Sequence, residues 1–90
     1  MMHIGLLGFG VVGGGVWARC APRDDLNVKR VLLRSPKEGL PEEVVTFNAD
    51  DILNDPEIDT VVEVMGGLHP AYEYVSAALA RGKSVVTANK

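Results

Sequence analysis

Short apolar runs alternate with segments rich in glycine, proline and charge along the whole chain. The runs are dominated by valine, isoleucine and leucine, which is typical of strands that are buried on both faces of a parallel sheet. Turn-forming residues bound each run. The pattern therefore predicts strands over residues 3–7, 26–34, 44–47, 59–65 and 83–87.

Helices are predicted between these strands, and the one over residues 70–81 has the clearest boundaries. Pro70 suits the first helical position, and Gly82 suits the left-handed residue that ends a helix. Glu73 near the start and Arg81 near the end complement the helix dipole. The apolar stripe of this helix is expected to consist of Ala71, Val75, Ala78 and Leu79.

Two further helices are predicted over residues 11–20 and 51–54. Asn48 or Asp50 is expected to cap the second of them. Strands that alternate with helices imply a parallel sheet with right-handed crossovers. We therefore expect an α/β fold with a doubly wound sheet, about five strands in the order 3-2-1-4-5, and ligands at the carboxyl ends of the strands.

A glycine motif, Gly8-x-Gly10-x-x-Gly13, follows the first predicted strand and opens the first predicted helix. This is the context in which the motif binds dinucleotides in Rossmann-type folds. Gly8 permits a tight turn, Gly10 lets a pyrophosphate approach the backbone, and Gly13 lets the helix pack against the strand. The N–H groups at the helix start would face the phosphates.

Composition narrows the functional class further. The chain has 90 residues, which allows one small domain over residues 1–90. The net charge of −3 disfavours a nucleic-acid or membrane partner. Cys20 is the single cysteine, so no internal disulfide forms, and we expect a buried thiol in a cytoplasmic protein without a signal peptide. No histidine or cysteine pair has metal-ligand spacing, so no metal site is expected.

The end of the second predicted strand carries Arg34, with Lys37 close behind it. In NAD sites this position usually holds an acid that binds the ribose 2′-hydroxyl. An arginine would instead bind a 2′-phosphate. We therefore predict that NADP is preferred, with NAD or the use of both cofactors as the alternative.

Three features of the last third of the chain could also belong to a site. Glu63 lies within an apolar strand, and we expect it to be buried with a hydrogen-bond partner in a structural role. Gly66 and Gly67 would let a ring or a ribose pack against the backbone at the sheet edge. Lys90 follows the fifth strand, where it could bind a substrate oxygen or the cofactor, or could be an ordinary terminal lysine.

Together these segments resemble the start of homoserine dehydrogenase, and the resemblance covers almost the whole chain. The glycine motif is shared by many dehydrogenases, whereas the later blocks are more specific. The matching segments are residues 5–16, residues 31–34, Glu63-Val64-Met65-Gly66-Gly67, Pro70-Ala71, residues 77–79 and Gly82-Lys83-Ser84-Val85-Val86-Thr87-Ala88-Asn89-Lys90.

The resemblance implies an NAD(P)-dependent oxidoreductase that interconverts aspartate semialdehyde and homoserine in threonine and methionine biosynthesis. It implies that Phe9, Gly10, Val11 and Val12 line the pyrophosphate and ribose. It also implies that Arg34 lies at the adenosine 2′ end and Gly66-Gly67 near the nicotinamide ribose, and that Lys90 lies beside cofactor and substrate.

Two other functions stay open at this point: a free-standing NAD(P)-binding sensor or regulatory module, and the nucleotide domain of another semialdehyde-linked oxidoreductase. The complete enzyme would act on a small molecule, homoserine or its semialdehyde, and we expect it to be a homo-oligomer. We expect residues 1–90 alone to be inactive, because the proton donor would lie elsewhere. The outer edge of the fifth strand is apolar and could pair with another chain.

Overall fold

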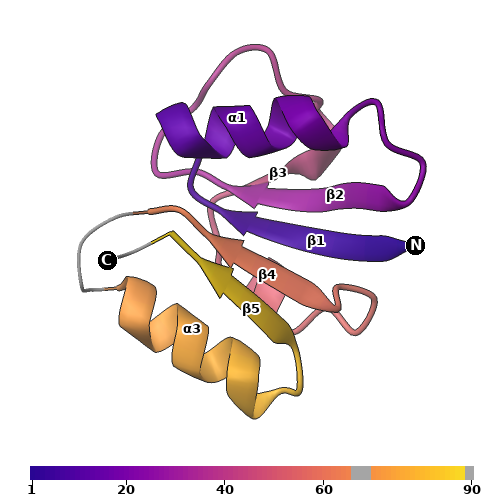
Figure 1. Cartoon of the computed structure of the whole chain (residues 1–90). Coiled ribbons are helices and arrows are strands. Elements are labelled where there is room, and N and C mark those ends of the chain that lie inside the picture. Colours follow the sequence, from indigo (N-terminus) through magenta and orange to yellow (C-terminus); the bar gives the residue numbers. More distant parts are fainter. Residues whose placement is uncertain (66–69, 89–90) are drawn as a thin grey trace.

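Parallel strands lie side by side in the order β3-β2-β1-β4-β5 in the computed structural model, which describes residues 1–65 and 70–88 (Figure 1). This order confirms the predicted α/β fold. The strands are β1 (Met2–Leu7), β2 (Leu26–Leu32), β3 (Val45–Thr46), β4 (Thr60–Glu63) and β5 (Ser84–Thr87). The helices are α1 (Val11–Cys20), α2 (Asp50–Leu53) and α3 (Ala71–Ala80), with a short 3₁₀ turn, η1, at Glu42–Val44.

Alternate residues of β1 serve two separate cores, one on each face of the sheet. Ile4 and Leu6 pack with Cys20 beneath α1, while Leu7 packs with residues of α2 and α3 on the opposite face (Figure 1). Cys20 is buried, as predicted, and Trp17 is half-buried at the margin of the α1 core. Within residues 1–65 and 70–88 no helix is long and apolar enough to cross a membrane.

Strands β2, β3, β4 and β5 are all shorter than the sequence predicts, and β2 and β4 each lose two residues at the carboxyl end. β2 ends at Leu32 instead of residue 34, because its neighbour β3 has only two residues and pairs with Val31 and Leu32. The N–H of Leu33 still donates to the Thr46 carbonyl at 2.9 Å. β4 ends at Glu63, so Val64 and Met65 leave the sheet. Arg34 and Met65 therefore lie beyond the strands, at the carboxyl edge of the sheet.

Helix α3 confirms one boundary signal and corrects the predicted apolar stripe. Gly82 has a φ of +78°, as expected of the residue that ends a helix. Ala71 and Ala78 are buried, but Leu79 is 58% exposed. At 100° per residue, Leu79 points well away from the face on which Ala71 and Ala78 lie. Tyr74 and Ala77 pack against the core instead.

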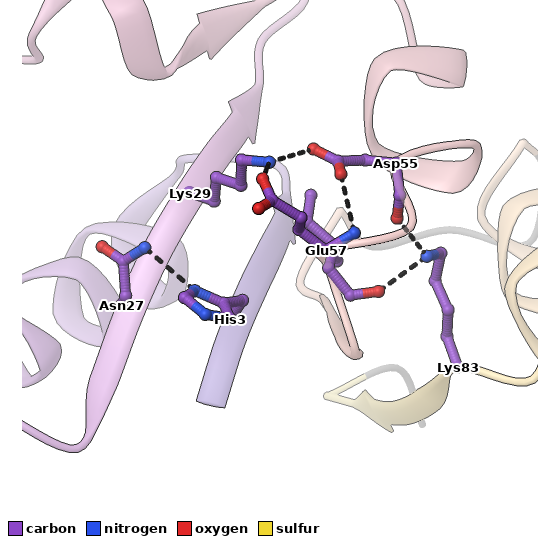
Figure 2. A network of polar contacts seen from close by, with 7 residues as sticks. His3, Asn27, Lys29, Asp55, Glu57 and Lys83 are labelled. Atoms are coloured by element: carbon purple, nitrogen blue, oxygen red, sulfur yellow. Dashed lines mark hydrogen bonds and ion pairs between the residues drawn. The ribbon is translucent and has the colours of Figure 1, made fainter. Parts of the chain in front are cut away.

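Two lysines hold the turn between α2 and β4 at the amino edge of the sheet (Figure 2). From β2, Lys29 Nζ donates to the carboxylates of Asp55, at 2.7 Å, and Glu57, at 2.5 Å. From the position just before β5, the buried Lys83 Nζ donates to the main-chain carbonyls of Asp55 and Ile58, both at 2.6 Å. The turn is thus fixed from both sides.

Acid is expected to lower the stability of the fold through Asp55 at this amino edge. The hydrogen bond from Lys29 lowers the pKa of Asp55 below its ordinary value of 3.8. In the unfolded protein the Asp55 carboxyl therefore binds a proton more readily than it does in the folded protein. Its contribution to the free energy of unfolding is present above pH 3.8 and is lost as the pH falls through the lower folded-state pKa. Melting curves from about pH 6 to about pH 2 test this.

The matched variant is Asp55→Asn, which keeps an oxygen for the N–H of Glu57, the donor to Asp55 Oδ1 at 2.9 Å. Its melting temperature is expected to lie below that of the unmodified protein near neutral pH, and the gap should close in acid. A gap that stays constant across the titration would contradict the assignment of this pH dependence to Asp55.

Candidate functional site

A pocket of about 260 Å³ opens at the carboxyl edge of the sheet, beside the end of β1. The chain continues from β1 to β2 on one side, whereas β4 lies on the other side, so the pocket is at the point where the strand order reverses. Open α/β sheets bind their ligands at this point. The pocket is lined by Gly8, Phe9, Gly10, Leu32, Leu33, Arg34, Ser35, Lys37, Val64 and Met65.

The three motif glycines have different surroundings. Gly8 has a φ of +102°, and a Cβ there would lie 3.3 Å from the Cα of Met65. A Cβ on Gly13 would lie 2.7 Å from the Gly8 carbonyl oxygen, so helix α1 packs directly on the turn. A Cβ on Gly10 would meet no atom within 4 Å. Gly8 and Gly13 thus have the predicted structural roles, and Gly10 leaves open space.

The amino end of α1 is open to a ligand. Gly10 is the N-cap residue, and it has no side chain to bind the free N–H groups. The first turn contains no acidic residue. Val11 is 95% exposed and Val12 is 55% exposed, so neither side chain is used in the core. An uncapped helix end without acids suits an anion such as a phosphate.

Arg34 and Lys37 both line the pocket, but their contacts differ. Arg34 is exposed and has no hydrogen bond or ion pair with any residue in the described part of the chain. Lys37 Nζ donates to the Phe9 carbonyl at 2.9 Å and lies 5.7 Å from the centre of the Phe9 ring. Lys37 therefore holds its loop against the glycine turn, while the guanidinium of Arg34 has no such partner among the described residues.

Apart from Ser35, the other side chains that line the pocket are apolar. The Phe9 ring packs edge-on against Trp17, with 6.4 Å between ring centres. Val64 and Met65 form the wall next to β4. The sequence prediction missed both of these residues. Their position directly after a buried strand, at the edge where the motif glycines lie, is the signal that could have found them.

Glu63 is fully buried at the end of β4, which confirms the prediction of a buried carboxyl with a partner. Its carboxylate accepts hydrogen bonds from the N–H of Met65, at 2.7 Å, and from the hydroxyl of Thr87, at 2.5 Å. The other predicted site residues in this part of the chain, Gly66, Gly67 and Lys90, lie outside the described residues.

This arrangement, a parallel sheet whose central strand turns through glycines into an uncapped helix, defines the class of dinucleotide-binding α/β domains. Within that class, a family model described as the NAD-binding domain of homoserine dehydrogenase matches residues 8–90. The chain belongs to this homoserine dehydrogenase family. Its members' domain binds a nicotinamide dinucleotide, which agrees with the predicted type of cofactor.

Relatives agree in sequence and in structure. Homoserine dehydrogenase of Bacillus subtilis is 36% identical over 99% of this chain, and that of Synechocystis is 43% identical over 99%. The crystal structure of homoserine dehydrogenase from Thiobacillus denitrificans has a TM-score of 0.86 at 42% identity over 98% of the chain. The chain spans 24%, 23% and 23% of these three proteins, respectively. A free-standing sensor is not favoured by these relatives.

Proposed function

We propose that this chain is the cofactor-binding part of an NADP-preferring homoserine dehydrogenase, which interconverts L-aspartate 4-semialdehyde and L-homoserine. The observation that supports it best is the Arg34 guanidinium, which lines the pocket and has no hydrogen bond or ion pair within residues 1–65 and 70–88. No acid ends β2 to bind a ribose hydroxyl or to repel a phosphate. The proposal includes a cytoplasmic homo-oligomer that acts in threonine and methionine biosynthesis.

The roles of individual residues follow from this proposal. The N–H groups at the start of α1 bind the pyrophosphate, and Gly10 leaves room for it. Arg34 binds the 2′-phosphate through a charge-assisted pair of hydrogen bonds, and Lys37 adds positive charge from its place against Phe9. When bound, the cofactor supplies or accepts the hydride at its nicotinamide ring. Gly66 and Gly67 border the nicotinamide ribose, and Lys90 binds beside cofactor and substrate.

We also propose that residues 1–90 alone do not turn over homoserine. Among the described residues that line the pocket, the charged ones are Arg34 and Lys37. Both lie beside the glycine turn and the end of β2. In this proposal both side chains bind the cofactor, and neither of them donates a proton to the substrate alkoxide. An assay of this chain with homoserine and NADP, beside the full-length dehydrogenase, distinguishes the two forms.

Replacing Arg34 by alanine is expected to weaken NADPH binding by roughly 1–3 kcal/mol, or about 5- to 150-fold, and to leave NADH binding nearly unchanged. The reason is that only NADPH carries the phosphate that the guanidinium binds. Calorimetric titration of both cofactors into the full-length dehydrogenase measures this.

Arg23→Ala is the matched control for the loss of one positive charge. Arg23 is exposed and pairs with Asp25 in the connection between α1 and β2, away from the pocket. This control should bind both cofactors normally. An equal loss of NADPH and NADH affinity in Arg34→Ala would contradict the proposed role of Arg34 and the preference for NADP.

A further inference from the structure

The buried carboxylate of Glu63 has an unusual environment. The side chain is 0% exposed, yet within residues 1–65 and 70–88 no cation forms an ion pair with it. Its hydrogen bonds come from two neutral groups, the Met65 N–H and the Thr87 hydroxyl. Burying a carboxylate costs free energy. If Glu63 only filled space, an apolar side chain of similar size would make the fold more stable.

The Met65 backbone that Glu63 binds is a wall of the cofactor pocket. A Cβ on Gly8 would lie 3.3 Å from the Met65 Cα and 3.4 Å from the Met65 N. The nitrogen that donates to Glu63 is therefore one of three Met65 atoms, with the Cα and the Cγ, that leave no room for a side chain at Gly8. Met65 leaves β4 at this point and lines the pocket with its neighbour Val64.

Glu63 also lies where three strand ends are joined by main-chain hydrogen bonds. The N–H of Val64 donates to the Leu7 carbonyl at 3.0 Å, which joins β4 to β1. The N–H of Ala88 donates to the Glu63 carbonyl at 3.0 Å, which joins β5 to β4. The carboxylate adds a side-chain link from Met65 to Thr87 across the same junction. One side chain thus fixes the Met65 wall relative to β5.

We propose that Glu63 is a positioning residue that sets the Met65 wall of the cofactor pocket against Gly8. It acts through Met65 and does not itself line the pocket. This inference rests on the proposed function, since it concerns the binding of NADP(H) in the same site. A wall held by hydrogen bonds should tolerate an amide in place of the carboxylate, because glutamine can accept from Met65 and donate to the Thr87 oxygen.

The experiment measures the dissociation constant of NADPH for variants of the full-length dehydrogenase, at a temperature where circular dichroism shows each to be folded. Glu63→Ala should raise this constant about tenfold or more, and Glu63→Gln should return it to within about threefold of the unmodified value. Thr87→Val removes one of the two donors and should give an intermediate value, which keeps the test open if Glu63→Ala does not fold.

Lys83→Met is the matched control for loss of a buried polar group. Lys83 is buried at the amino end of β5, and its bonds hold the opposite edge of the sheet. This variant should lower the melting temperature and leave the dissociation constant of NADPH within about twofold.

Three results would overturn this inference and leave the proposed function standing. The first is unchanged NADPH binding by both Glu63→Ala and Thr87→Val. The second is weakened binding in Lys83→Met equal to that of Glu63→Ala, which would make the effect one of general stability. The third is a Glu63→Gln variant as weak as Glu63→Ala. An unmodified protein that binds neither NADPH nor NADH would overturn the proposed function, and this inference with it.

Discussion

A methyl group at Gly10 is expected to weaken NADPH binding on the order of 10²-fold while the melting temperature of the ligand-free protein stays nearly unchanged. The added Cβ meets no protein atom within 4 Å, so nothing in the fold opposes it. It does occupy the space through which a pyrophosphate would approach the start of α1. Paired titration and melting experiments on Gly10→Ala measure the two effects separately.

Gly15→Ala is the matched control, because it adds the same methyl group within α1, where a Cβ also meets no atom within 4 Å. Gly15 lies one turn beyond the helix start, so NADPH binding should be retained. Alanine is the better helix former, which should raise the stability by up to about 1 kcal/mol. Normal NADPH affinity in Gly10→Ala would mean that the phosphates do not bind beside Gly10.

Replacing Lys90 by alanine in the full-length dehydrogenase is expected to lower turnover on the order of 10²-fold or more. Strand β5 ends at Thr87, at the same edge as the pocket, and Lys90 follows three positions later in the sequence. Groups that act on a ligand gather at this edge of an open α/β sheet. A lysine there would bind a substrate oxygen beside the nicotinamide and stabilise its negative charge as hydride moves.

Steady-state kinetics with homoserine and saturating NADP measure this effect, and Lys90→Arg is the comparison that keeps the charge. Arginine should recover part of the lost turnover, because its guanidinium can still bind an oxygen but has a different shape. Wild-type values of kcat and KM in Lys90→Ala would show that Lys90 contributes neither to substrate binding nor to turnover.

The glycine turn could be predicted because local geometry requires glycine at two of its positions, Gly8 and Gly13. The positive φ of Gly8 and the 2.7 Å approach between a Gly13 Cβ and the Gly8 carbonyl are requirements of one short segment. The strand order could likewise be predicted, because alternating strands and helices leave few topologies. Both features depend on residues that are close together in the sequence or on rules that hold for the whole class of fold.

Contacts between distant segments could not be predicted in this way. Gly5 is an example, because a Cβ there would lie 2.4 Å from the Ile52 Cγ2, so β1 needs a glycine where α2 crosses it. The bond from Lys37 to the Phe9 carbonyl joins a loop of irregular structure to the glycine turn. No spacing in the sequence encodes either contact, since each depends on how separate elements pack.

The same limit applies to the different surroundings of the two basic residues of the site. Both residues follow β2, and the sequence predicts that Arg34 binds the 2′-phosphate with Lys37 close behind it, but it does not predict the contacts of either side chain. In the folded protein Lys37 donates to the Phe9 carbonyl, while Arg34 has no hydrogen bond or ion pair with any residue that the structure describes. The selectivity for a 2′-phosphate should therefore depend mainly on Arg34.

A crystal structure of the full-length dehydrogenase with NADPH tests the central claim most directly, namely that the pocket beside β1 holds the dinucleotide. The account predicts that pyrophosphate oxygens accept hydrogen bonds from N–H groups between Gly10 and Gly13, and that the 2′-phosphate is bound by Arg34. A dinucleotide bound away from the glycine turn, or a 2′-phosphate that Arg34 does not contact, would contradict it.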